Sequence, residues 1–161
     1  MKKSIIAIFL SIFLFVSLVY SQNFDKTIDF AIDLEALDRL ASGKNNFTIN
    51  TGKYIILTGV ISKIHIISKN ENAFIAEIEL TDGKWKGVES VIGYHCIIRL
   101  EGKEFFKRIY NAREKERFSE IKDIIKLNSY IMVVGKIKGF RKINGVNTGV
   151  IAGTSVRTVL D

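Results

Sequence analysis

The sequence predicts a mainly β fold in which five strands close into one small barrel. Segments that alternate apolar and polar residues make up most of the chain after residue 53, and one segment of helical spacing separates the third strand from the fourth. Two of the strands share a frame of Tyr-Ile, three apolar or small residues, Gly, any residue and Ile, at residues 54–61 and 130–137. A glycine inside a strand marks a bulge, a sharp bend or a close backbone approach, and barrel closure uses such features.

The first 22 residues have the plan of a secretory signal peptide. Two lysines precede an apolar run of 16 residues from Ile5 to Tyr20, interrupted by two serines. We expect residues 1–21 to be cleaved near Ser21, so that the protein is exported to the periplasm or another part of the cell envelope. The competing interpretation is an uncleaved membrane anchor, but the run falls short of the roughly 20 apolar residues of a spanning helix. The membrane would then be contacted through this segment alone.

Charge and cysteine content narrow the class of protein. Loss of Lys2 and Lys3 with the leader lowers the formal net charge from +7 to +5, which is mildly basic and favours anionic partners. An abundance of Lys, Ile and Asn equally fits a biased genome composition. Cys96 is the only cysteine, so the chain forms no intramolecular disulfide and its stability must come from packing.

A helix is predicted ahead of the barrel. From Phe24 to Leu40 apolar residues recur at helical spacing with acidic residues between them, which indicates an amphipathic helix of about four turns that ends at Gly43. Residues 42–52 are polar and flanked by glycines, so we expect residues 22–52 to be helix and linker. The helix either covers an open edge or end of the barrel or docks on a partner.

The barrel is expected over residues 53–161, where alternation of apolar and polar residues defines the strands. Residues 81–93 contain three glycines and the single tryptophan, and they predict a long loop or an irregular hairpin. Residues 105–110 fit either a helix or the end of the third strand. The five strands are predicted at residues 54–67, 74–80, 94–100, 130–140 and 148–160.

A helix and a tight turn complete the order of elements. Phe118, Ile121, Ile124 and Ile125 have helical spacing between the third and fourth strands. The Asn-Gly pair within residues 141–147 is a strong hairpin signal. Three strands, a helix and two strands, with a long first strand, is the chain order of the OB-fold, a five-stranded Greek-key barrel.

The first strand carries a specific prediction about barrel closure. Apolar residues and Gly59 share one face up to Ile61, whereas Ile64 and Ile66 have the opposite parity. A bulge inserts one residue and so returns both sets to the interior, and we expect this bulge at Gly59. In the fourth strand, the odd-numbered residues 131–137 should face the interior.

The segments GKYIILTGVISKI, YHCIIRL and LNSYIMVVGKIKG together resemble a family of short bacterial envelope proteins with a single OB domain, many of them lipoproteins. The resemblance covers about residues 54–159, and the domain of that family is described as similar to the anticodon-binding domain of tRNA synthetases. This chain lacks the lipobox cysteine and a cysteine in the last strand, so neither lipid anchoring nor a disulfide carries over. The resemblance implies an exported binding or accessory module and supplies no catalytic residues.

Catalytic and metal chemistry are not expected. His95 and Cys96 are adjacent on a strand, so their side chains point to opposite faces and cannot share a metal. Glu77 and Glu79 lie two apart on the second strand, as carboxylates do on any half-exposed strand face. The sequence contains no phosphate-binding Gly-Lys-Ser/Thr motif and no nucleophile elbow. We therefore expect a protein that is not an enzyme and has no cofactor or metal.

Candidate ligand-binding residues follow from the expected fold. OB-folds bind ligands on the face of strands two and three and at the loops beside it. Glu77 and Glu79 face outward there and would repel phosphates, which disfavours single-stranded nucleic acid. Lysines around the fourth strand are equally explained if this strand lies at the edge of the sheet, where lysines prevent aggregation. The candidates are Trp85, His95, Arg99, Lys136, Lys138, Phe140, Arg141 and Lys142, with Lys84 and Lys86 beside the tryptophan.

Three functions remain open. The first is a non-catalytic OB-fold binding module of the bacterial cell envelope, with a peptide or protein, a glycan or an anionic polymer as its ligand. The second is an interaction or scaffolding subunit of an envelope complex that docks through the N-terminal helix. The third is the binding of single-stranded nucleic acid.

Overall fold

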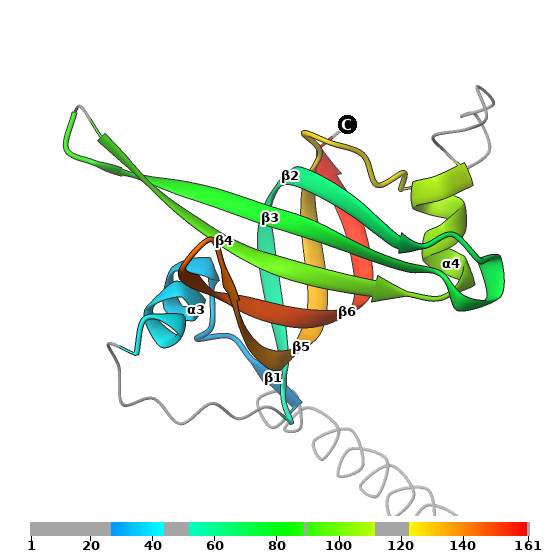
Figure 1. Ribbon diagram of the computed structural model, residues 1–161. Coiled ribbons are helices and arrows are strands. Elements are labelled where there is room, and N and C mark those ends of the chain that lie inside the picture. Colours follow the sequence, from blue (N-terminus) through cyan, green and yellow to red (C-terminus); the bar gives the residue numbers. More distant parts are fainter. Residues whose placement is uncertain (1–26, 44–51, 89, 112–122, 161) are drawn as a thin grey trace, which may run out of the picture.

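The computed structural model describes residues 27–43, 52–88, 90–111 and 123–160. Figure 1 shows a mainly β domain whose five long strands close into a barrel. The predicted signal peptide at residues 1–21 lies outside the described residues. The strands are β2 (Tyr54–Ser68), β3 (Ile75–Lys86), β4 (Ser90–Glu101), β5 (Tyr130–Ile143) and β6 (Val146–Leu160).

The strand order confirms the predicted OB-fold. Around the barrel the order is β2, β3, β4, β6, β5 and back to β2. Neighbouring strands are antiparallel except β4 and β6, which run parallel from Cys96 opposite Gly149 to Leu100 opposite Gly153. The pairing of β2 with both β3 and β5 closes the ring, so the long first strand of the barrel belongs to both halves of the sheet.

The two strands that share the Tyr-Ile frame pair with each other. β2 and β5 are antiparallel, with Ile55 opposite Gly135 and Gly59 opposite Ile131. Each glycine therefore lies across from the isoleucine of the other frame, so the repeat in the sequence becomes an approximate two-fold symmetry of the strand pair. The inward residues of β5 are buried as predicted: Ile131, Val133, Gly135 and Ile137.

Gly59 and Gly135 each allow a close approach between strands. A Cβ atom at Gly59 would lie 2.6 Å from the carbonyl oxygen of Thr81 on β3. One at Gly135 would lie 2.5 Å from the carbonyl oxygen of Ala152 on β6. Any side chain at these positions would force the backbones apart where the barrel closes.

The predicted bulge on the first strand exists, but at a different residue. The register between β2 and β3 shifts between Ile61 and Lys63, so Ser62 is the extra residue. Gly59 itself stays in regular register with β5, because its missing side chain serves the close approach and not the bulge. The parity change has the expected effect, since the later isoleucines of β2 pack against the core.

The N-terminal helix is shorter than predicted. Residues Ile28–Asp29 form a short strand, β1, which runs parallel to the start of β2. Helix α3 spans Leu34–Ala41 and begins after Asp33, whose carboxylate accepts a hydrogen bond from the Ala36 amide at 2.7 Å. It ends where expected, because Gly43 follows it with a φ of 67°. From Ile28 to Asp33, pairing with β2 and the cap at Asp33 thus override the helical periodicity, and residues 24–26 of the predicted helix lie outside the described residues.

Helix α3 packs its apolar face against β4 and β6. Leu37 is fully buried, and a Cβ atom at Gly149 of β6 would lie 2.7 Å from its side chain. On the exposed side, Glu35 pairs with Lys84 of β3 at 3.3 Å. The small residue Gly149 of β6 therefore leaves room for helix α3 to pack against this strand.

The segment predicted as a loop or irregular hairpin is a regular hairpin. β3 and β4 remain paired without a register shift out to Lys86 opposite Ser90. Figure 1 shows this ribbon, here called the arm (residues 81–86 and 90–95), extending beyond the barrel. Glycine has a low strand propensity, so the residues of the arm alone predict a loop and only their cross-strand pairing makes a strand.

The connection between β4 and β5 begins with helical turns. α4 spans Lys103–Phe105 and a π-helical turn follows at Phe106–Asn111, so residues 105–110 are helical and do not prolong the strand. Of the residues that predicted a helix here, Phe118 and Ile121 lie outside the described residues, whereas Ile124 and Ile125 are described and lie in no helix. No helix within the described ranges is long and apolar enough to cross a membrane.

Candidate ligand-binding face

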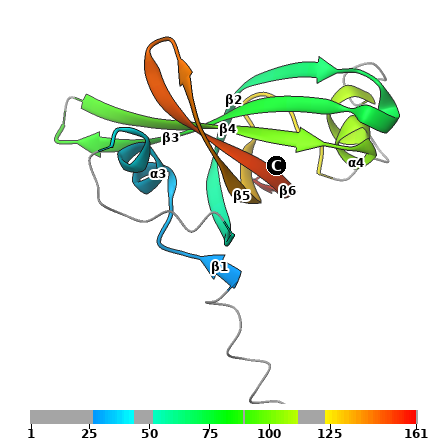
Figure 2. The same cartoon turned by 60° about the horizontal axis from the view of Figure 1, so that its bottom comes forward.

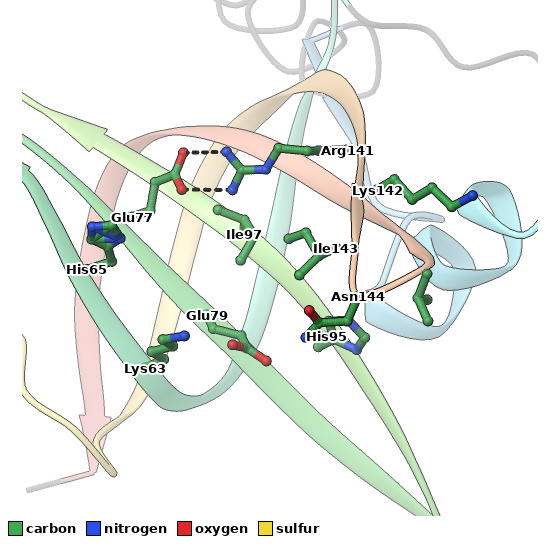
Figure 3. A pocket seen from close by; sticks show the side chains of 11 residues that line it. Lys63, His65, Glu77, Glu79, His95, Ile97, Arg141, Lys142, Ile143 and Asn144 are labelled. Carbon is green, nitrogen blue, oxygen red and sulfur yellow. Dashed lines mark hydrogen bonds and ion pairs between the residues drawn. The ribbon is translucent and has the colours of Figure 1, made fainter.

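A pocket of about 630 Å³ lies on the outer face of the barrel. Side chains of β2, β3 and β4 form one wall, and the β5–β6 hairpin forms the other (Figure 3). In Figure 2 this hairpin and the arm leave the barrel as two separate projections. The pocket is lined by Lys63, His65, Glu77, Glu79, His95, Ile97, Arg141, Lys142, Ile143, Asn144 and Val146.

The geometry of the hairpin follows from its turn and from one bulge. Asn144 and Gly145 have φ values of 49° and 86°, as a two-residue type I′ turn requires. Gly139 has a φ of 145° at a register shift between β5 and β6, where a bulge bends the strand. Beyond this bend Arg141 points to the sheet, whereas Lys142 extends away from it (Figure 3).

An ion pair joins the hairpin to the sheet. Arg141 donates two hydrogen bonds to the Glu77 carboxylate, from Nη1 to Oε1 at 3.0 Å and from Nη2 to Oε2 at 2.7 Å. The Glu77 side chain is 11% exposed. The hydrogen bonds from Arg141 lower the pKa of Glu77, and desolvation opposes this shift without reversing it. The same contact raises the pKa of Arg141, so both groups are charged and neutralise each other.

Other ionisable groups surround the pair. His65 lies directly across from Glu77 on β2, and Lys63 lies across from Glu79. His95 Nε2 lies 3.2 Å from the hydroxyl oxygen of Thr148, which holds the ring in place. Among the described residues, Lys63, Glu79 and Lys142 take part in no ion pair.

An apolar floor lies between these charges. Ile97 is on the outward face of β4, as its parity predicts, yet it is 7% exposed. It lines the pocket together with Ile143 and Val146 of the hairpin. The pocket therefore combines an apolar floor with charged groups at its rim, which is the general composition of ligand-binding sites.

The structure brings three of the eight predicted ligand-binding residues together in the pocket: His95, Arg141 and Lys142. Arg99 lies next to them on β4, opposite Glu77, and donates to the carboxylate of Glu101 at 2.6 Å.

The other four candidates lie outside the pocket lining. Trp85 is on the arm and is 70% exposed. Lys136 places its Nζ 4.4 Å from the ring centroid of Tyr54, on the part of β5 that pairs with β2. Lys138 and Phe140 occupy exposed positions of β5.

Several pocket residues are not recognisable from the sequence as part of a site. Lys63 and His65 lie after the bulge on β2, so their outward direction depends on where that bulge falls. In the sequence, Ile143 and Val146 stand on either side of the Asn-Gly turn, so they predict only the ends of two strands and not a pocket wall. The Asn-Gly turn is a visible signal for the hairpin, but no signal in the sequence indicates that the hairpin folds over the sheet.

Neither the cysteine nor a metal cluster contributes to the pocket in the described residues. Cys96 is fully buried, and desolvation raises the pKa of its thiol well above the usual range. No three His, Cys, Asp or Glu side chains within the described ranges are placed to hold a metal ion. What the pocket offers is charge, hydrogen bonding and apolar contact.

The fold and the pocket define this chain as an OB-fold protein with a hollowed outer face. No protein-family model matches the chain, and no curated protein does. Similar folds are found among solved structures. One is a small single-stranded DNA-binding protein from Streptomyces coelicolor, with 10% identity and a TM-score of 0.43, covering 66% of this chain and 92% of that one.

A second similar structure is the second single-stranded DNA-binding protein from Mycobacterium smegmatis, with 9% identity and a TM-score of 0.39, covering 66% of this chain and 87% of that one. A third is the N-terminal domain of the PriB protein from Thermoanaerobacter tencongensis, with 10% identity and a TM-score of 0.37, covering 67% and 97%. These similarities are so distant that they concern the fold alone.

Proposed function

We propose that the protein is a non-catalytic binding module whose ligand lies on the outer face of β3 and β4, beneath the β5–β6 hairpin. The observation that carries this proposal is the pocket between the sheet and the hairpin. It lies on the face that OB-folds use for oligonucleotides and oligosaccharides. The sheet forms one wall of the pocket and the hairpin forms the other, so a ligand would lie between them.

The charges favour an anionic ligand. From the sequence alone, the outward carboxylates of Glu77 and Glu79 disfavour the binding of phosphates. In the structure, Arg141 neutralises Glu77. Three charged residues of the described lining then remain without an ion pair: the positive Lys63 and Lys142 and the negative Glu79. Positive charge in excess attracts polyanions. Single-stranded nucleic acid is therefore the first candidate ligand.

Location in the cell envelope is a second and independent part of the proposal. It rests on the sequence of residues 1–21, and it would make an anionic glycan, another envelope polymer or an envelope protein the ligand in place of nucleic acid. The scaffolding alternative has less support, because α3 buries its apolar face, with Leu34, Leu37 and Ala41, against the barrel.

A salt titration tests the first candidate. Fluorescence anisotropy of a labelled oligothymidylate of about 16 nucleotides, the upper site size of one OB-fold, would measure the dissociation constant at rising salt. We expect the logarithm of affinity to fall linearly with the logarithm of salt concentration, since bound phosphates release counterions. The double variant Lys63→Ala and Lys142→Ala should bind more weakly and with a shallower slope.

Lys126→Ala is the matched control, because Lys126 is exposed and lies outside the pocket lining. It should leave affinity and slope unchanged. Absence of oligonucleotide binding at low salt would overturn the nucleic-acid candidate. The same titration with a sulfated polysaccharide would then test an anionic glycan as the ligand. Export is tested separately: the protein from an envelope fraction should begin near Gln22 when its N-terminus is sequenced.

A further inference from the structure

The outer face of the pocket continues onto the arm. β3 and β4 pair in unbroken register, so residues opposite each other share one face from Glu79 and Ile97 to Trp85 and Val91. Trp85 is 70% exposed and Val91 is 53% exposed. An apolar patch of these two residues, the arm patch, therefore lies on the same surface as the pocket.

A pair of glycines separates the arm patch from the pocket. Gly83 and Gly93 are direct cross-strand partners on this face. Neither has a positive φ, and no register shift occurs beside them. A Cβ atom at Gly83 would lie 3.0 Å from Val91 Cγ1, so packing explains that glycine.

Gly93 has no such explanation within the folded chain. A Cβ atom there would meet nothing within 4 Å. Glycine inside a strand is unfavourable, and its usual causes are a bulge, a bend or the close approach of a ligand or another backbone. Regular register and an ordinary φ remove the first two causes, and the empty surroundings remove a contact within the described chain.

We propose that one ligand chain occupies the pocket, crosses the bare surface at Gly93 and stacks a base on Trp85. This inference rests on the proposed function and names its ligand as a single strand of nucleic acid. Charge supports this occupant, because Lys63 and Lys142 line the pocket at one end of this path and take part in no ion pair among the described residues. A base stacked on an exposed aromatic ring contributes to binding without regard to sequence.

The distance from the pocket to the arm patch sets the length of a stacked strand that reaches both. Glu79 and Trp85 are six positions apart on one strand, which corresponds to about 20 Å at roughly 3.3 Å per residue. Stacked nucleotides are spaced by about 3.4 Å, so about six of them are needed to join the pocket to the arm patch. A stacked trinucleotide, about 10 Å long, would fill the pocket without reaching Trp85.

Intrinsic fluorescence provides the test, because Trp85 is the only tryptophan. Oligothymidylates of about 3 and about 12 nucleotides, one shorter and one longer than the stacked strand of about six, would be titrated into the protein at low salt. We expect the longer strand to quench Trp85 and to bind more tightly, while the trinucleotide binds without quenching. Trp85→Ala should weaken the longer strand about 5- to 150-fold, the range of one stacked base, and leave its salt slope unchanged.

Gly93→Val tests the path itself, since valine favours a strand but adds a side chain where the ligand would cross. It should weaken the longer strand at least about tenfold and spare the trinucleotide. Ile92→Ala is the matched control, because Ile92 is the next residue on the opposite face of the arm. It should change neither affinity.

Three outcomes would overturn the inference. If both lengths bind equally and Trp85 is not quenched, the arm plays no part and the pocket proposal stands. If neither length binds, the proposed nucleic-acid function fails and the inference fails with it. If Trp85 emission shifts with protein concentration alone and sedimentation shows a dimer, a second copy of the chain covers the arm patch.

Discussion

At the scale of single residues, the contact between Glu77 and Arg141 decides the character of the binding face. An outward glutamate on a half-exposed strand is ordinarily solvated and repels anions. Here the hairpin brings a guanidinium onto it, with two hydrogen bonds of 3.0 and 2.7 Å. Bidentate pairs of this kind are stronger than single ionic contacts and more specific in geometry. The pair thus holds the hairpin to the sheet and removes a negative charge from the pocket.

Glu77→Gln should lower the free energy of unfolding by about 1 kcal/mol at neutral pH, because the amide cannot pair with Arg141 as a charge. The pKa of Glu77 is lowered in the folded state, so its carboxylate stabilises the protein fully above its ordinary pKa of 4.5. This stabilisation is lost as the pH falls through the lowered pKa. Urea denaturation of both proteins from pH 7 downward should show the difference shrinking below about pH 4.5.

Glu101→Gln is the control for that measurement. Glu101 also pairs with an arginine on the same sheet, but its side chain is 59% exposed, so little stability should be lost. If the gap between the native protein and the Glu77 variant stayed constant into acid, loss of charge would not be its cause.

At the scale of elements, glycines decide where neighbouring segments come together. Gly59 and Gly135 let β2 and β5 approach β3 and β6, and Gly149 accepts Leu37 of α3. Leu37 and the barrel residues belong to one buried cluster. The helix is therefore part of the same cooperative core as the strands.

Leu37→Ala should destabilise the whole protein by about 2–5 kcal/mol, the usual cost of removing a buried leucine, because the barrel cannot collapse around the cavity. Chemical denaturation followed by circular dichroism would measure this loss as one shifted transition. Arg39→Ala, on the exposed face of α3, should cost only a few tenths of a kcal/mol. A variant in which α3 alone melts, with an unchanged barrel transition, would contradict a shared core.

At the scale of the whole molecule, closure of the barrel protects its interior. β2 pairs with β5, and β4 pairs with β6, so the five barrel strands form one ring. Cys96 lies on β4 inside this ring and is fully buried. Access to its thiol therefore requires the ring to open.

Cys96 should react with a thiol reagent only as fast as the barrel unfolds. The expected result is slow labelling in native buffer and a rate that rises with urea in parallel with the unfolding equilibrium. A Cys96→Ala protein with Ser90→Cys on the arm is the control, because Ser90 is exposed and its replacement should react at once. Rapid labelling of Cys96 in native buffer would mean that β4 and β6 separate locally.

Local patterns in the sequence determined the strands, their inward faces and the turn of the β5–β6 hairpin. Alternation with a period of two assigns a residue to a face whatever its partners are, so it predicts Ile131, Val133 and Ile137 as core. The Asn-Gly turn is equally local, because it depends on the φ angles of two residues. The order of these elements is enough to predict the OB-fold.

Only the tertiary structure decided the bulge at Ser62, the short helix, the strands of the arm and the binding face. Each depends on partners far along the chain: β1 is extended because it pairs with β2, and the glycine-rich arm is paired because β3 and β4 align. Arg141 and Glu77 are 64 residues apart and meet because the hairpin folds over the sheet. Glu77 is neutralised only because Arg141 lies close to it in space, and the fold of the hairpin over the sheet sets that distance.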